Sequence, residues 1–209
     1  MAQGRATREA LVDAAEGLFG RAGYAATSIE EIVAAAGVTK GAMYHHFPDK
    51  EALFKAVFEK VQQQVSDKVA AEFLQLEPWD ALVAGCRLWI DVHLDPAVRQ
   101  IALTDARAVL GWDIARAVET RFSAVALRGA LRKAIHAGVI EPQPLRPLAL
   151  MLTGALSEAC LYVAQADDAD GARDEVSNLI VSVLAGLRVG QGDNVADRLS
   201  LEVGSGLTR

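Results

Sequence analysis

Four closely spaced residues, Lys40, Gly41, Tyr44 and His45, form an unusual outer face if their segment is helical. Such a face suits DNA, because Gly41 lets a backbone approach the groove while Lys40 and His45 reach base edges or phosphates. Tyr44 can donate a hydrogen bond to a phosphate, although its ring could instead pack against the first helix. Together these residues predict a recognition helix that enters the major groove.

The neighbouring sequence predicts the elements that must position this face, a helix-turn-helix over about residues 28–47. Ser28 and Glu31 have the spacing of a capping box at the start of the second helix. Thr39 can cap the third helix, and Gly37 allows a tight turn between the two. The motif therefore has a defined start for each helix.

The other side of the third helix predicts how it is held. Met43 and Phe47 point inward, and His46 lies nearer this inner face, where we expect it to help dock the third helix on the fourth. Asp49 can cap the fourth helix. Lys50, beside that helix N-terminus, is placed to bind a phosphate that flanks the groove.

The stretch TSIEEIVAAAGVTKGAMYHHFPDKEAL, together with the preceding LFGRAGYAATS, resembles the DNA-binding domain of the TetR (tetracycline repressor) family. The family pattern FxxxGYxxTS, then IxxxAGVxxGxxYxHFxxKExL, is matched almost without departure over a domain of about residues 5–60. The resemblance implies a larger helical domain after it, residues 61–190, that dimerises and binds a small-molecule inducer. It also implies DNA contacts by Thr27, Ser28, Thr39, Lys40, Tyr44, His45 and Lys50.

Helical periodicity dominates the chain and predicts an all-α fold of about nine helices. Glycine, proline and acidic stretches separate the expected elements. The last segment, residues 191–209, is rich in glycine and polar residues, so we expect a loose tail. Outside the helix-turn-helix, we expect helices at residues 7–22, 50–76, 79–94, 97–109, 112–136, 145–166 and 171–189.

The composition limits the classes of function. At 209 residues, 52% of them hydrophobic, the chain can bury a full core. Its net charge of −6 argues against indiscriminate binding to nucleic acid, so DNA binding must rest on local geometry. We expect no stretch long enough to span a bilayer and no signal peptide, and hence a cytoplasmic protein.

The histidine and cysteine spacings argue against a metal site. Cys86 and Cys160 lie far apart in apolar contexts, which predicts buried, reduced thiols. The adjacent His45 and His46 diverge by about 100° on a helix, and no further ligand converges on them in sequence. We therefore expect no metal and no cofactor.

Five residues of the C-terminal domain, Trp79, Trp89, His93, Trp112 and Phe122, lie on helices that surround the inducer cavity in TetR-family relatives. Aromatic walls with a few polar groups suit an apolar or aromatic effector. Ordinary core packing is the alternative for each residue.

Two helices near the C-terminus predict a dimer interface. Each bears an apolar stripe, and two such helices from each subunit can form a four-helix interface, as is usual in the TetR family. Alternatively, one subunit buries both stripes itself. A dimer also suits the DNA, because two half-sites one helical turn apart multiply the affinity. The stripes are Leu148, Leu152, Ala155, Leu156, Ala159 and Val163, and Val176, Leu179, Ile180, Val183, Leu184 and Leu187.

The sequence therefore predicts a homodimeric transcriptional repressor that leaves a palindromic operator when an inducer binds. An activator, or a regulator controlled by a protein partner, is the alternative. We expect no enzymatic activity, because the chain has no GxSxG, no HExxH, no glycine-rich phosphate loop and no convincing acid/base pair.

Overall fold

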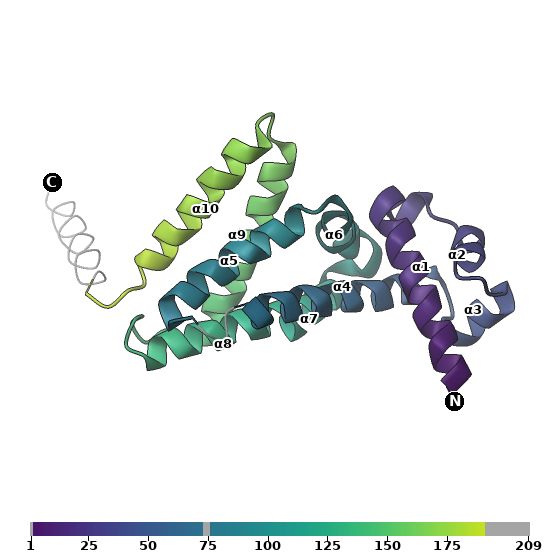
Figure 1. The fold of residues 1–209 in the computed structure, drawn as a ribbon, viewed down its shortest axis with the longest axis horizontal. Helices are drawn as coiled ribbons and strands as arrows, with labels where there is room; N and C mark the ends of the chain where they lie inside the picture. The colour runs from purple at the N-terminus through teal and green to yellow at the C-terminus, as the bar shows by residue number, and fades with distance from the viewer. Residues whose placement is uncertain (1, 73–75, 191–209) are drawn as a thin grey trace, which may run out of the picture.

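The structure, a computed structural model, describes residues 2–72 and 76–190 and is built from helices (Figure 1). The all-α prediction is confirmed, and these residues hold one isolated bridge between Ile140 and Arg188 but no strand. The expected tail, residues 191–209, lies outside the described part. The elements are α1 (Ala2–Ala26), α2 (Ile29–Ala35), α3 (Lys40–His46), α4 (Lys50–Glu72), α5 (Pro78–Leu94), α6 (Pro96–Arg99), the π-helical η1 (Gln100–Asp105), α7 (Ala106–Arg121), α8 (Ser123–His136), α9 (Leu145–Gln165) and α10 (Ala169–Ala185).

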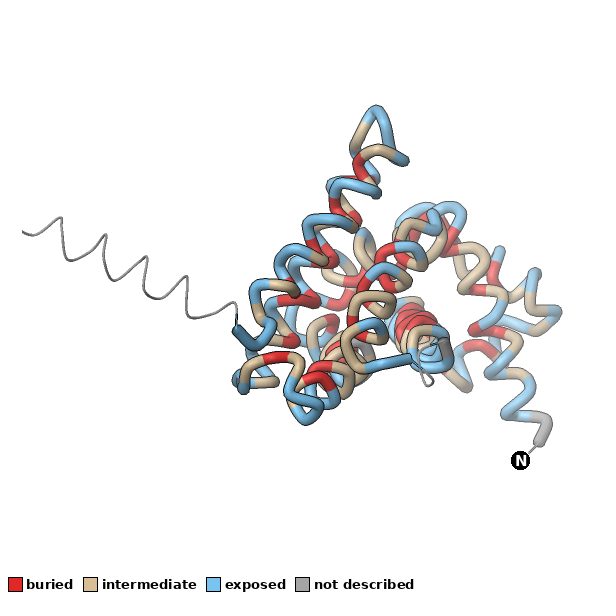
Figure 2. Tube along the Cα trace, turned by 60° about the vertical axis from the view of Figure 1, so that its left-hand side comes forward, coloured by how far each residue is buried: buried red, intermediate tan, exposed pale blue. Residues whose placement is uncertain are grey.

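The helices α1, α2 and α3 gather at one end of the molecule, and α4 runs from them into the larger group of helices (Figure 1). Leu11, Phe19, Phe54 and Phe58 are fully buried where α1 packs on α4. Buried residues line the inner faces of the helices, and exposed residues cover the outer faces (Figure 2). One hydrophobic core thus joins both ends of the molecule.

The first helix departs from its predicted bounds at both ends. Gly23, expected to stop the helix, leaves the helical conformation with φ 77° and ψ 165°. The helix nevertheless begins earlier than residue 7, and its backbone resumes a helical turn up to Ala26. A backbone with positive φ is accessible to glycine at little cost, so Gly23 can bend the chain here without ending the element.

The middle of the chain departs from the predicted boundaries. The helices expected at residues 97–109 and 112–136 are instead α6, the π-helical η1, α7 and α8. Gly111, expected to separate two helices, does adopt φ 76°, but it lies within α7. The second break falls at Phe122, where no glycine or proline marks it. Helical periodicity continues across both features, so the pattern alone misplaced the ends.

The expectation that no stretch is long and apolar enough to span a bilayer was wrong for α9, which reaches the length and hydropathy of a membrane-crossing helix. Length and composition alone are weak grounds for such a span. This helix packs against α5, α8 and α10, and Leu152, Leu156, Cys160 and Val163 are buried there. One face of α9 therefore belongs to the core, while Met151 and Tyr162 on another face are exposed.

Candidate functional site

The outer face of α3 has the composition predicted from the sequence. Lys40, Gly41 and His45 are exposed, and the side chain of Tyr44 is 47% exposed. On the opposite side, Met43 and Phe47 are buried, which confirms the predicted orientation of the helix. The face therefore presents a cation, a phenol and an imidazole beside a glycine that adds no bulk.

Local hydrogen bonds fix the starts of α2 and α3. The Ser28 N–H donates to Oε2 of Glu31 at 2.8 Å, and the Glu31 N–H donates to Oγ of Ser28 at 3.2 Å. These bonds complete the predicted capping box, and the hydrogen bond from the Ser28 N–H lowers the pKa of Glu31. Oγ1 of Thr39 accepts from the Ala42 N–H at 3.1 Å, as predicted for the cap of α3.

The start of α4 is capped in the same way, because Oδ1 of Asp49 accepts from the Ala52 N–H at 2.7 Å. This contact confirms the predicted cap at Asp49. Gly37 adopts φ 65° in the turn between α2 and α3, a conformation that glycine adopts readily. The recognition helix α3 and its two neighbours in sequence, α2 and α4, therefore all have side-chain caps at their starts.

One cation of this face is already paired within the chain. Nζ of Lys40 donates to Oε1 of Glu30 at 2.5 Å, an exposed ion pair that joins α3 to α2. The hydrogen bond from Lys40 lowers the pKa of Glu30 and raises that of Lys40. Because an exposed ion pair contributes little free energy, Lys40 can exchange Glu30 for a phosphate or base at low cost.

Two residues implied as DNA contacts hold the chain together in this structure. Nζ of Lys50 donates to the carbonyls of Tyr24 and Thr27 at 2.8 and 2.9 Å, and lies 4.0 Å from the centre of the Tyr24 ring. Thr27 is buried, and its Oγ1 donates to the carbonyl of Gly23 at 2.8 Å. Both contacts stiffen the corner that leads into Ser28.

This corner is also the joint between the two domains. The Tyr24 N–H, freed by the bend at Gly23, donates to Oδ2 of Asp105 at 2.8 Å. Asp105 ends the π-helical segment η1, which packs on α1. Sequence reasoning missed Asp105, because a lone aspartate inside a helical pattern gives no sign of a partner 81 residues away.

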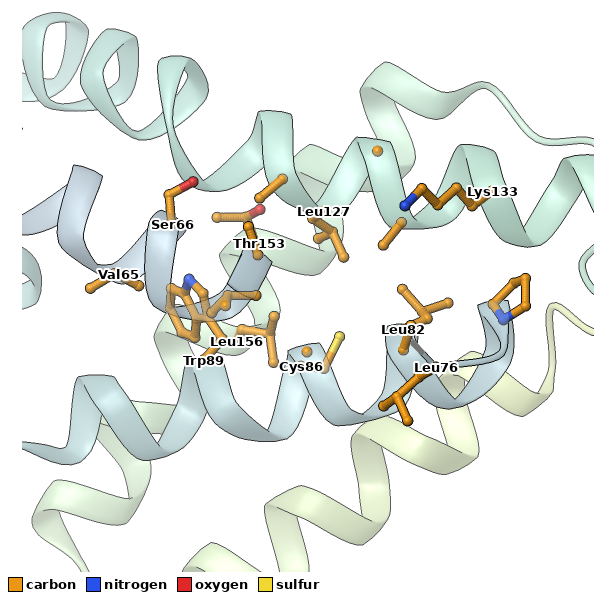
Figure 3. A pocket seen from close by; sticks show the side chains of 18 residues that line it. Val65, Ser66, Leu76, Leu82, Cys86, Trp89, Leu127, Lys133, Thr153 and Leu156 are labelled. Atoms are coloured by element: carbon orange, nitrogen blue, oxygen red, sulfur yellow. The ribbon is translucent and has the colours of Figure 1, made fainter. Parts of the chain in front are cut away.

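A cavity of about 240 Å³ lies in the C-terminal domain between α4, α5, α8 and α9 (Figure 3). Its walls are largely apolar, with Val65 and Val69 from α4, Leu82 from α5 and Leu127 from α8. Oγ of Ser66, Oγ1 of Thr153 and Sγ of Cys86 supply a few polar atoms. Such a site suits a small molecule with an apolar body.

Only Trp89, of the five predicted ligand-binding residues, lines this cavity. His93 lies behind it, with its ring stacked on the Trp89 ring at a centroid distance of 3.7 Å. Trp79 is half-buried against Arg188 and lies outside the cavity wall. The search for aromatic residues therefore found one residue of the cavity wall, Trp89, and missed the aliphatic side chains that form most of the wall.

The other two predicted residues lie on α7 and at its end. Trp112 is 56% exposed, with the guanidinium groups of Arg107 and Arg116 about 4.9 and 5.5 Å from its ring centre. Phe122 stands at the break between α7 and α8 and packs against the core. Neither residue lines the cavity.

Burial controls the ionisation of the groups near the cavity. Desolvation lowers the pKa of His93 to about 4, and its Nδ1 contacts the carbonyl of Trp89 at 2.9 Å. Nε2 of His93 is buried, and no group in the described part of the chain forms a hydrogen bond with it. Cys86 and Cys160 are buried free thiols, as predicted, and burial raises the pKa of both to about 12. All three groups are neutral at pH 7.

Within residues 2–72 and 76–190, no three histidine, cysteine, aspartate or glutamate side chains converge in a way that could hold a metal ion. The rings of His45 and His46 meet edge to face, with centroids 5.2 Å apart.

Both parts of the chain match families of known proteins. Residues 11–57 match the family model "Bacterial regulatory proteins, tetR family". Residues 79–187, over half of the chain, match "Tetracyclin repressor-like, C-terminal domain". The chain belongs to the TetR family. The exposed face of α3 lies within residues 11–57, the part of the chain that matches the family's bacterial regulatory model.

Relatives of this TetR-family protein include the Transposon Tn10 TetC protein of Escherichia coli, 31% identical over 109 residues, which are 52% of this chain and 55% of TetC. The regulator CymR of Pseudomonas putida is 31% identical over 54% of this chain and 58% of its own length. The chain thus spans little more than half of these curated relatives. A TetR-family regulator from Pectobacterium atrosepticum, 29% identical, has the same fold with a TM-score of 0.79, over 90% of this chain and 97% of that one.

Proposed function

We propose that this TetR-family regulator is a homodimeric, cytoplasmic repressor that binds a palindromic operator and leaves it when a small apolar or aromatic molecule binds. The observation that carries the DNA part is the exposed face of α3, where Lys40, Tyr44 and His45 flank Gly41. The opposite side of this helix is buried in the core. In this proposal His45 and Lys40 contact base edges or phosphates, and Tyr44 contacts a phosphate.

In this proposal the residues at the helix starts support DNA binding. The N-terminal ends of α2, α3 and α4 carry a partial positive charge that favours phosphate, and Ser28, Thr39 and Lys50 lie at these ends. Lys50 and Thr27 already make internal contacts, and we propose that they act on DNA binding mainly by holding the corner before α2. Their loss would weaken binding to every sequence alike.

A face that the subunit does not bury supports the homodimer. Leu152, Leu156 and Val163 of the predicted stripe on α9 pack inside the subunit, as do Val176 and Ile180 of α10. Leu179 (64%) and Val183 (49%) of the predicted α10 stripe stay exposed, as do Met151 (72%) and Tyr162 (56%) of α9, which lie outside the predicted stripe. A second copy of this pair of helices would cover that apolar face in a four-helix interface.

Two routes connect the cavity with α3. Val65, Ser66, Val69 and Ala70 of α4 line the cavity, so a ligand displaces the helix that begins at Lys50. The second route runs from α5 through α6 and η1 to α1, where the carboxylate of Asp105 holds the N–H of Tyr24. A ligand changes operator affinity only if it binds the two states of this joint with different affinities.

The test is a titration of the full chain against the DNA that flanks its own gene, at physiological salt with random competitor DNA. We expect saturable binding of two subunits per palindrome. His45→Ala should weaken binding or alter sequence preference, whereas the matched control His136→Ala, an exposed histidine on α8, should bind as the wild type does. Tyr44→Phe removes only the hydroxyl group and should weaken binding to all sequences.

Binding no tighter than to competitor DNA would contradict the assignment of this operator. Equal effects of His45→Ala and His136→Ala would contradict the assignment of the α3 face. If transcripts of the neighbouring genes fall when the gene is deleted, the regulator is an activator and the repressor part of the proposal is wrong.

A further inference from the structure

The cavity has a buried end and an exposed end. Trp89, Cys86, Thr153 and Leu156 form the buried end, each at most 8% exposed. The other end includes Pro78, Leu76, which is 45% exposed, and the exposed Lys133. Leu76 and Lys133 are labelled on the right in Figure 3. A molecule in this cavity therefore meets an apolar, water-free end and a polar, solvated one.

The buried end offers little to a charged group. Oγ1 of Thr153 donates its proton to the carbonyl of Ala149 at 2.8 Å, so it faces a ligand only as an acceptor. The Cys86 thiol is protonated at neutral pH because burial raises its pKa to about 12. An ionised head group would lose its hydration here and meet no opposite charge, so this end favours an apolar body.

Among the described residues that line the cavity, Lys133 is the one with a charged side chain, and it is positive in a chain of net charge −6. Its Nζ lies on the side toward Leu127, over the cavity (Figure 3). Within the described residues, Nζ of Lys133 makes no hydrogen bond or ion pair, and the same holds for Lys55 and Lys68. A ligand carboxylate would supply the missing counter-charge.

We propose that this cavity binds organic acids, with the apolar body directed toward Trp89 and a single anionic head group paired with Lys133 at the open end. The inference rests on the proposed role of the cavity as the effector site and names the chemical class of the effector. A neutral or cationic molecule with the same body loses this ion pair, and the cationic one is repelled.

The cavity volume selects a probe. At about 30 Å³ for each water-sized group, 240 Å³ holds roughly eight such groups. Octanoate and octan-1-ol are suitable probes, because they share an apolar body of this size and differ in the head group. Their comparison in the same protein separates the contribution of the anion from that of the apolar body.

The experiment measures the dissociation constants of octanoate and octan-1-ol with the full chain by calorimetry. In Lys133→Gln we expect octanoate to bind about two- to fivefold more weakly, the size of an exposed ion pair, and octan-1-ol to bind as before. Arg132→Gln is the matched control, since Arg132 is the adjacent exposed cation on α8 but does not line the cavity. That variant should bind both probes as the wild type does.

A second variant tests the location. A Cβ on Gly129, which lines the cavity, would meet no atom within 4 Å, so Gly129→Leu fills the space without a clash at the backbone. It should weaken the binding of both probes at least tenfold. Unchanged binding in Gly129→Leu would overturn the location in this cavity.

Three results would overturn the assignment of the ligand class: no octanoate binding to the wild type, equal losses of both probes in Lys133→Gln, or the same octanoate loss in Arg132→Gln. Operator affinity is measured separately, with and without octanoate. Octanoate that binds through Lys133 but leaves operator affinity unchanged would support the acid site and contradict the proposed effector role, so the two failures are distinguishable.

Discussion

In the N-terminal domain, Ser28, Thr39 and Asp49 cap the starts of helices at the surface, whereas polar groups of the C-terminal domain, such as Thr153 and His93, bond within their own helix inside the core. The first arrangement leaves a polar outer face available for DNA. The second removes hydrogen-bonding capacity from the walls of a cavity. The difference shows that the location of the hydrogen-bond partners matters. Partners at helix starts give a rigid polar surface, whereas partners inside a helix leave an adaptable apolar interior.

The largest expected effect concerns the core beneath the N-terminal corner. Phe54 is fully buried, and its ring meets Phe19 and Tyr24 edge to face at 5.3 and 5.2 Å between centroids. Phe54→Ala should lower the free energy of unfolding by about 3–5 kcal/mol, measured by urea denaturation at pH 7. Leu156→Ala, beside the existing cavity, should cost about 2 kcal/mol, because part of its surroundings is already empty. If Leu156→Ala lowers the free energy of unfolding more than Phe54→Ala does, the core beneath the N-terminal corner is not the more sensitive of the two regions.

The second effect tests the buried polar group of the C-terminal domain through pH. Because burial lowers the pKa of His93 to about 4, from an ordinary value near 6.5, the unfolded chain binds more protons between these values. Stability should therefore fall as pH decreases from 6.5 to 4, with up to about 3 kcal/mol of the loss due to His93. Urea denaturation of the wild type and His93→Phe, compared at pH 7 and pH 4.5, isolates this contribution.

His136→Gln serves as the control for that experiment, because His136 is an exposed histidine of the same domain. Its stability should follow the wild type across the pH range. If His93→Phe loses as much stability at low pH as the wild type, the buried imidazole does not titrate as its burial implies.

The helix caps of the N-terminal domain could be predicted from the sequence to the level of single hydrogen bonds. The caps at Ser28, Thr39 and Asp49 depend on residues three positions apart, and such local spacing is visible in a sequence. The cavity could not be predicted in the same way. Its wall combines aliphatic side chains from four helices, and only Trp89 of the five proposed aromatic and histidine residues belongs to it.

The contacts at the joint between the domains could not be predicted from the sequence either. Lys50 has the spacing of a DNA-contact residue, and the sequence gives no sign that its ammonium group binds two carbonyls of the preceding corner. Asp105 lies in a π-helical turn, which ordinary helical periodicity does not distinguish from an α-helix. Such contacts depend on tertiary geometry, so no local sequence pattern predicts them.

The third effect tests whether this joint couples the two regions. Asp105→Ala leaves the N–H of Tyr24 without its partner and should cost about 1.5–3 kcal/mol, as expected for a hydrogen bond to a charged group. Asp105→Asn keeps an acceptor oxygen and should recover part of the loss, while Asp113→Ala, at an exposed position of α7, should change little. Urea denaturation gives the stability, and operator titration gives the effect on DNA binding. Loss of stability with unchanged operator affinity would show that the contact holds the fold without positioning α3.

The smallest effect concerns the polar caps themselves. Ser28→Ala removes the side-chain acceptor for the Glu31 N–H and should lower the free energy of unfolding by about 1 kcal/mol. Ser28→Thr retains the hydroxyl group and should lose much less, so the two variants separate the cap from the side-chain volume. Because the cap also orients α2 beneath the face of α3, Ser28→Ala should weaken operator binding more than Ser28→Thr does. Equal losses in both variants would mean that packing around residue 28, and not its hydrogen bonds, sets the start of the helix-turn-helix.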